Sequence, residues 1–108
     1  MSTLRNKVQL IGNLGSNPKI ITLENGNKLA KISLATNEHF KDKDGQKQTK
    51  TEWHNLVAWN KTAEIVEQFV AKGKEIAVEG KLSTRNYLDK EGHKRYTTEV
   101  IVDELLLL

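Results

Sequence analysis

The chain has 108 residues, a mass of 12.2 kDa and a net charge of +3, which is the size of one small folded domain. Charges of both signs are interspersed, which excludes a disordered polyelectrolyte, and the absence of cysteine excludes disulfides and thiolate sites. No apolar run could cross a membrane, and the N-terminus lacks the apolar segment of a signal peptide, so we expect a cytoplasmic protein without membrane contact.

The positive charge is unevenly distributed. Residues 96–108 hold three acidic side chains and no basic one, so residues 1–95 hold 17 basic against 11 acidic side chains, a balance of +6. This bias favours a polyanionic partner, because basic side chains neutralise phosphates and release counterions. Ordinary solubilising charge is the alternative, so the charge suggests nucleic acid without deciding it.

Strand patterns alternate with turn signals along most of the chain. Glycine combined with asparagine or aspartate punctuates segments rich in β-branched, leucine and aromatic residues, which is typical of strands joined by hairpins. Within these patterns, Gly12 and Gly80 predict bulges or tight bends of the kind that a small closed barrel needs. The predicted strands cover residues 5–12, 28–37, 51–60, 75–87 and 94–104.

One segment, residues 62–72, has helical instead of strand periodicity, with apolar residues three and four positions apart. We expect Phe69 to lie in the core on the apolar face of this helix. Asn60 or Thr62 can cap its start, and Gly73 suits a left-handed stop. The spacing therefore predicts a helix between the third and fourth strands.

Five strands with one helix between the third and the fourth follow the order of an OB-fold, an all-β, five-stranded Greek-key barrel. The sequence contains no linker, internal repeat or low-complexity tract. Because 108 residues leave little room for two cores, we expect a single domain over residues 1–108.

The few aromatic residues have polar surroundings. Trp53 and Trp59 share one face of the third predicted strand, and Tyr87 shares a face of the fourth with Lys81 and Arg85. Rings alternating with basic side chains suit a single-stranded nucleic acid, whose bases stack while its phosphates are neutralised. Burial is the alternative reading, and for the two tryptophans the residues alone leave core and stacking surface equally open.

Two further aromatic residues differ in their settings. Phe40 begins a lysine-rich hairpin tip and has no apolar neighbour, which favours a stacking role. Tyr96, between a basic residue and two threonines, is expected to be structural.

Sequence motifs link these features to a known family. They run in order and with compatible spacing through Asn6-Lys7-Val8, Leu10-Ile11-Gly12-Asn13-Leu14-Gly15, Ser33-Leu34-Ala35-Thr36, Thr51-Glu52-Trp53-His54, Val78-Glu79-Gly80 and Arg95-Tyr96-Thr97-Thr98-Glu99-Val100. In this collinear set the chain resembles the bacterial-type single-stranded DNA-binding proteins over roughly residues 6–102. The resemblance implies an OB-fold that forms a homotetramer and wraps single-stranded DNA without sequence preference, in replication, recombination and repair, and without a cofactor.

The resemblance also implies site residues. Bases are expected to stack on Phe40, Trp53, Trp59 and Tyr87. Phosphate contacts are expected, from the resemblance and the basic pattern together, at Lys7, Lys43, Lys61, Lys72, Lys81, Arg85 and Arg95. Subunit contacts are expected at Val8, Leu10 and His54.

The sequence departs from the family pattern in two ways. Asn55, Ser83 and Asn86 stand where relatives commonly have basic residues, so we expect a smaller loss of binding with salt. The flexible tail with an acidic tip, through which such proteins recruit replication enzymes, has no counterpart here, so tail-mediated recruitment is not expected. The four leucines at 105–108 are expected to pack partly under the barrel or at a subunit contact.

Three other readings have less support. His39, His54 and His93 do not have metal-ligand spacing, and residues 42–45 resemble only a fragment of a calcium loop, so we expect no metal and no catalysis. A protein-interaction OB module could dispense with the aromatic set, which this chain retains at all four positions. Single-stranded RNA uses the same stacking chemistry and stays open as a ligand.

Overall fold

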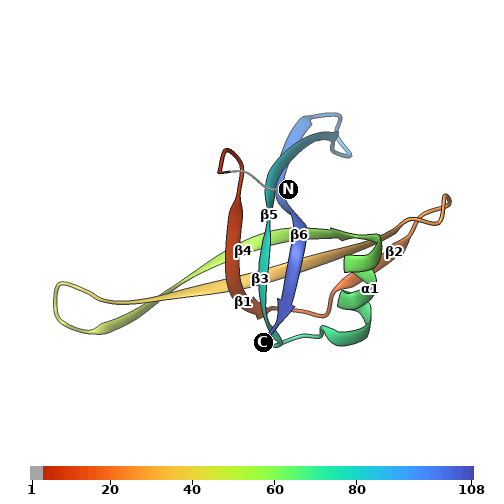
Figure 1. Ribbon diagram of the computed structural model, residues 1–108. Coiled ribbons are helices and arrows are strands. Elements are labelled where there is room, and N and C mark those ends of the chain that lie inside the picture. The colour runs from red at the N-terminus through yellow and green to blue at the C-terminus, as the bar shows by residue number, and fades with distance from the viewer. Residues whose placement is uncertain (1–3) are drawn as a thin grey trace.

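The computed structural model describes residues 4–108, which form six strands and one helix. In chain order these are β1 (Val8–Leu14), β2 (Lys19–Thr22), β3 (Lys28–Lys41), β4 (Lys47–Trp59), α1 (Asn60–Phe69), β5 (Glu75–Leu88) and β6 (Lys94–Leu107). Figure 1 shows the β3–β4 and β5–β6 hairpins extending from the body of the fold as two long arms in different directions. We call these the β3–β4 arm and the β5–β6 arm.

The strands close into a barrel. Their order is β1-β5-β6-β4-β3-β2. A further pairing of β1 with β3, at Asn13 opposite Ala35, closes this sheet on itself. The β4–β6 pair is parallel, with Leu56 opposite Val100, whereas the other pairs are antiparallel. Because β1 and β2 are two halves of one bent strand interrupted around Pro18, the result is the predicted five-stranded OB-fold barrel.

Two glycines permit the bends of this barrel. A Cβ at Gly12 would overlap the carbonyl of Ala35 on β3, and a Cβ at Gly80 would overlap the carbonyl of Ile101 on β6. A register shift between β5 and β6 occurs at Glu79/Gly80. Both positions therefore need a residue without a side chain. The register shift confirms the predicted irregularity at Gly80, whereas Gly12 keeps the register with β5 and permits a close approach to β3.

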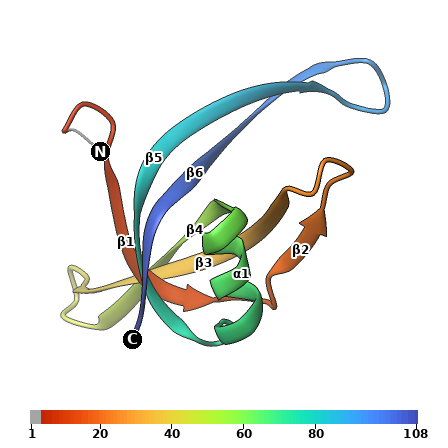
Figure 2. The same cartoon turned by 45° about the vertical axis from the view of Figure 1, so that its right-hand side comes forward.

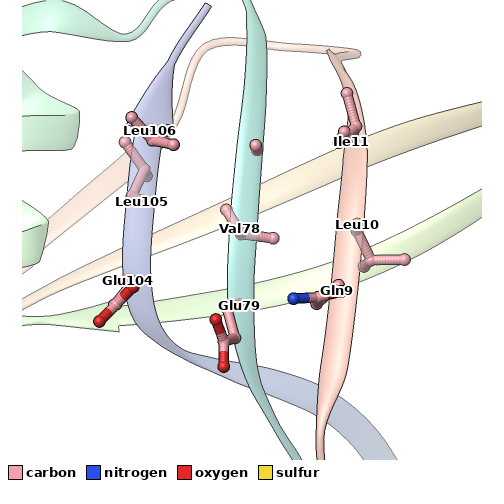
Figure 3. A pocket seen from close by; sticks show the side chains of 9 residues that line it. Gln9, Leu10, Ile11, Val78, Glu79, Glu104, Leu105 and Leu106 are labelled. Atoms are coloured by element: carbon pink, nitrogen blue, oxygen red, sulfur yellow. The ribbon is translucent and has the colours of Figure 1, made fainter.

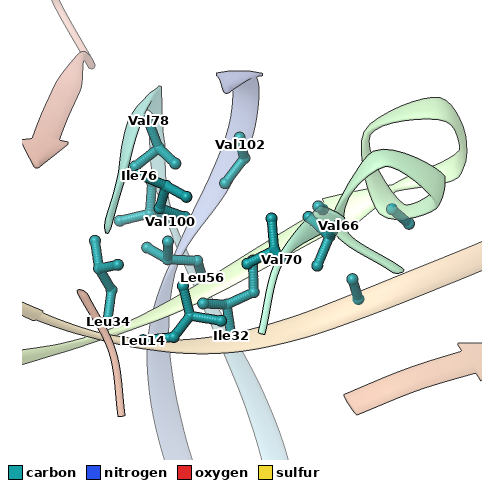
Figure 4. Packing of buried hydrophobic residues seen from close by; sticks show 13 residues of the cluster. Leu14, Ile32, Leu34, Leu56, Val66, Val70, Ile76, Val78, Val100 and Val102 are labelled. Carbon is teal, nitrogen blue, oxygen red and sulfur yellow. The ribbon is translucent and has the colours of Figure 1, made fainter. Parts of the chain in front are cut away.

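The core fills the barrel and extends under α1. Leu34, Leu56 and Ile76 are fully buried inside the barrel, and Val66 brings α1 against them. Figure 4 shows these side chains converging from the strands and the helix. Burial of an aliphatic side chain contributes about 1.5–3 kcal/mol to the free energy of folding. The buried face of α1, which consists of Ala63 and Val66, therefore holds the helix against the barrel.

The helix differs from its prediction in position and in orientation. It spans Asn60–Phe69 instead of residues 62–72, and no side chain caps its start, because the N-cap residue is Trp59, which has no side-chain acceptor. The amide oxygen of Asn60 accepts a hydrogen bond from the Lys28 backbone instead. Phe69 is 59% exposed, so its expected place in the core was wrong. Only the narrow stripe through Ala63 and Val66 faces the barrel, and Phe69 lies beside that stripe.

The C-terminal strand also extends further than predicted. β6 continues to Leu107, and Leu105 packs against the core while Leu106 points outward. Tyr96, expected to be structural, is 65% exposed on the β5–β6 arm. Strand alternation thus divides the terminal leucines between the core and the outer surface.

The two arms end in the same kind of turn. Asp42 and Asp89 each accept backbone N–H groups of their own loop through Oδ1, and Gly45 and Gly92 supply the left-handed conformation with φ of 78° and 83°. Such a three-residue loop with a left-handed glycine is a common hairpin closure. Hydrogen bonds to these charged carboxylates, foremost from the backbone of Gln46 and His93 respectively, lower the pKa of both aspartates.

Candidate nucleic-acid interface

A polar hollow lies between the two arms and the segment that joins β1 to β2. Its volume is about 320 Å³. It is lined by Ser16, Asn17, Lys19, Lys31, Ile32, Ser33, Asn55, Leu56, Arg85, Thr97 and Glu99. We call it the groove. Figure 2 shows the β5–β6 arm bending away from the β3–β4 strands, and both hairpins contribute residues to the groove.

The two tryptophans lie on β4, on the strand face that also carries Asn55 of the groove. Trp53 is 60% exposed and Trp59 is 40% exposed, which is high for such large apolar side chains. Strand alternation places both on the same side as Asn55. Of the two readings open from the residues, core and surface, the structure selects surface for both.

Phe40 and Tyr87 lie further out, near the ends of the two arms. Phe40 is opposite Gln48 on the β3–β4 arm, where it lines a shallow hollow with Lys41 and Lys47. The alternation along β3 and β4 places Phe40 on the strand face opposite to that of Trp53. The four rings therefore do not form one flat platform; they are distributed around the open side of the barrel and along its arms.

Tyr87 has basic neighbours. It pairs with Arg95 across the β5–β6 arm and shares its strand face with Arg85, which lines the groove. All three side chains are exposed, as the strand pattern predicted for Tyr87 and Arg85. This face of the arm continues the polar surface of the groove outward.

Three of the predicted phosphate-contacting residues have carboxylate partners. Arg85 donates its Nε–H to Glu99 at 3.0 Å, and Arg95 donates its Nε–H to Asp89 at 3.0 Å. Lys7 forms an ion pair with Glu79 at 3.0 Å on the outer face of β1 and β5, away from the groove. The structure therefore does not bring Lys7 together with the other site residues.

The other four predicted cations are exposed and, within residues 4–108, form no ion pair: Lys43, Lys61, Lys72 and Lys81. Lys72 lies at one end of the groove, because its backbone N–H binds the side chain of Asn17. Lys61 follows Trp59 by two residues, and Lys43 is at the tip of the β3–β4 arm. Two of these cations, Lys61 and Lys43, are thus close in the chain to the rings of Trp59 and Phe40.

Sequence reasoning missed two basic residues of the groove, Lys19 and Lys31. Lys31 alternates with the buried Ala30 and Ile32 on β3, so the strand pattern contained a signal for an outward-facing cation. Lys19 belongs to β2, a strand of four residues that the sequence did not predict. With Arg85, these two lysines make the groove a surface suited to an anionic chain.

The residues expected at subunit contacts lie along β1 and on β4. Val8 and Leu10 are half-buried against the core, and among the described residues no strand pairs with the edge of β1 that faces away from β5 between Val8 and Gly12. His54 is half-buried, with Nε2 2.9 Å from the hydroxyl of Thr36. An unpaired strand edge is a ready surface for strand addition.

An OB-fold barrel with an open, basic groove between two arms, accompanied by exposed rings, defines a binder of single-stranded nucleic acid. A model of the single-strand binding protein family matches residues 5–108. The chain belongs to this family.

Known proteins similar to this chain agree with that assignment. It is 51% identical over 104 residues to "Single-stranded DNA-binding protein 1" of Xylella fastidiosa, covering 95% of this chain and 76% of that protein. It is 43% identical to the protein of the same name from Chlorobaculum tepidum, again over 95% of this chain but only 64% of the relative. The chain thus spans less than two thirds of the second relative.

Two solved structures share the fold. The chain of a Plasmodium falciparum SSB complex with ssDNA superposes with a TM-score of 0.86 at 32% identity, covering 100% of this chain and 97% of that one. A deletion mutant of the single-stranded DNA binding protein from Thermus aquaticus gives 0.81 at 29% identity, covering 95% of this chain and 50% of that one. Over the described residues, no helix has the length and apolar character needed to span a membrane.

Proposed function

We propose that the protein binds single-stranded DNA without sequence preference, by stacking bases on Phe40, Trp53, Trp59 and Tyr87 and by holding phosphates with lysine and arginine side chains. Binding of single-stranded DNA as such follows from membership of the family. The observation that carries the mechanism is the exposure of Trp53 and Trp59 on the strand face that continues into the basic groove.

Stacking explains a lack of sequence preference. Every base has a π-face, and each stacked base contributes about 1–3 kcal/mol whatever its identity. Reading a duplex would instead require an element that enters its major groove. The single helix of the described chain packs on the barrel through Ala63 and Val66, and carries no arginine.

We propose a homotetramer as the functional form. A tetramer with two kinds of two-fold axis needs two separate self-complementary surfaces, and the barrel offers two candidates. One is the unpaired edge of β1 at Val8–Gly12, described above. The other is the outer face of β1, β5 and β6, where Ile11, Ala77 and Leu106 lie in one row.

This outer face is unusually apolar for exposed surface. Ile11 and Leu106 are both more than 60% exposed, and they flank a hollow of about 280 Å³ with Gln9, Glu79 and Glu104 at its polar end. Figure 3 shows these side chains on the three adjacent strands. An apolar row bordered by polar residues is the pattern of a protein contact, which supports the second subunit surface.

In the cell, we propose that the protein covers single strands exposed in replication, recombination and repair, in the bacterial cytoplasm, and acts without catalysis. Coverage would prevent re-pairing and nuclease attack. Fluorescence anisotropy with labelled oligo-dT, a mixed-sequence strand, the matching duplex and oligo-U tests the proposal. Similar affinity for both DNA strands with little binding to duplex supports it. A strong preference for one sequence or for duplex would refute it, and tighter binding of oligo-U would make RNA the ligand.

A further inference from the structure

The groove contains a carboxylate, which is unexpected in a surface for an anionic chain. The side chain of Glu99 on β6 is only 16% exposed, whereas the side chain of Arg85, its partner on β5, is 55% exposed. The two residues are diagonal neighbours across the β5–β6 pair, and both line the groove with Thr97. A largely covered negative charge is costly unless it is paired, so its position calls for a function.

The ion pair with Glu99 occupies only the Nε edge of the Arg85 guanidinium group. The Nε–H of Arg85 binds Oε1 of Glu99 at 3.0 Å, and among residues 4–108 no hydrogen bond involves its terminal Nη groups. A guanidinium has five N–H donors in a rigid plane. Fixing the Nε edge therefore sets the direction of that plane and leaves the four Nη donors available to the groove.

The second arginine–carboxylate pair of the arm provides a contrast. Asp89 binds Arg95 with the same 3.0 Å distance, but it also accepts backbone N–H groups of Glu91 and His93 and so holds the turn together. Within residues 4–108, the carboxylate of Glu99 has no partner besides Arg85. Its carboxylate therefore serves the arginine and not a loop.

We infer that Glu99 is a positioning residue that orients Arg85 so that its Nη groups contact the DNA backbone in the groove. This inference rests on the proposed function. A long arginine side chain loses rotamer freedom when it binds a phosphate. Because Glu99 already fixes the Nε edge in the unbound protein, less rotamer freedom remains to be lost when the DNA binds. Glu99 supports binding although its own charge repels phosphate.

Two substitutions separate positioning from charge. Glu99→Ala removes both the acceptor and the charge, whereas Glu99→Gln removes the charge and keeps an oxygen that can accept the Nε–H. We expect Glu99→Ala to weaken oligo-dT binding about three- to tenfold, which lies within the range of one ordinary hydrogen bond. The slope of log K against log salt should become shallower by about 0.7, the value for one phosphate contact on a single strand. Glu99→Gln should stay close to the original protein in both readouts.

Glu67→Ala is the matched control, because Glu67 pairs with Lys28 at 2.7 Å on α1, outside the groove. It should leave the salt slope unchanged. In an Arg85→Ala background, Glu99→Ala should not weaken binding further. Thermal melting of each variant separates loss of fold from loss of binding. If Glu99→Ala does not fold, the binding of Glu99→Gln is compared with that of the unsubstituted protein instead.

Tighter or unchanged binding by Glu99→Ala, or a loss of binding that persists when Arg85 is absent, would overturn the inference. If Glu99→Ala does not fold, weak binding by a folded Glu99→Gln would also overturn the inference. Failure of the unsubstituted protein to bind oligo-dT would instead overturn the proposed function itself.

Discussion

The indole of Trp53 lies directly against Gly15, the first residue after β1. A Cβ at position 15 would overlap the six-membered ring of the indole. The loop between β1 and β2 therefore supports one side of the ring, while 60% of the side chain remains exposed. The absence of a side chain at Gly15 sets where this stacking surface lies.

A larger residue at position 15 should displace the ring. We expect Gly15→Val to shift the tryptophan emission spectrum and to weaken oligo-dT binding, with Gly15→Ala intermediate. Because Gly15 is exposed, the melting temperature should change little. Emission spectra, anisotropy and thermal melting measure the three quantities. Native-like affinity in Gly15→Val would show that the position of the ring does not matter.

Removal of the Trp53 ring should cost about 1–3 kcal/mol of binding free energy, the contribution of one stacked base. Phe69→Ala is the matched control, because Phe69 is exposed to almost the same extent, 59% against 60%, but lies on α1. That variant should bind normally. If Trp53→Ala binds as tightly as the unsubstituted protein while the tetramer stays intact, Trp53 is not a stacking residue.

Charged residues in the apolar row should break the assembly. We expect Ile11→Glu and Leu106→Glu to convert the proposed tetramer to smaller species, because each would bury an unpaired charge at the contact. We also expect His54→Tyr to loosen it, since the larger ring cannot keep the contact with Thr36. Sedimentation at low micromolar protein measures the mass. Intact tetramers in all three variants would exclude these surfaces.

Acid should loosen the arm tips before the barrel. The pKa values of Asp42 and Asp89 are lower in the folded chain than in the unfolded chain, because loop N–H groups bind their charged forms. The carboxylates therefore stabilise the folded arms above the ordinary aspartate range, and this contribution is lost as the pH falls through the lowered values, below about pH 4. NMR titration should show both pKa values below the ordinary aspartate value of about 3.9. Ordinary values would contradict the loop geometry.

The sequence predicted the barrel well where one strand face is buried. Alternation around Ile76 and Val78 located β5, and Gly12 and Gly80 located the close approaches. The β3–β4 arm was underestimated because its outer half has no buried face, so the alternation that signals a strand is missing there. Phe69 was misplaced because helical spacing shows which residues share a face, but not how wide a stripe the barrel covers.

The candidate site could be predicted only in part from the sequence, for a similar reason. Rings and cations could be identified one at a time, but the Arg85–Glu99 pair depends on the register between β5 and β6. Lys19 required a short strand that only pairing with β3 stabilises. Contacts across strands are set by the closure of the barrel, which single-strand patterns do not specify.

The central claim is that single strands stack on exposed rings beside a basic groove. Titration of the intrinsic tryptophan fluorescence with oligo-dT, at low and high salt and with duplex as control, tests it most directly. Trp53 and Trp59 are the only two tryptophans in the chain, and both belong to the proposed surface. We predict strong, saturable quenching by the single strand, little by duplex, and affinity that falls with salt. Binding without any change in tryptophan emission would contradict the account.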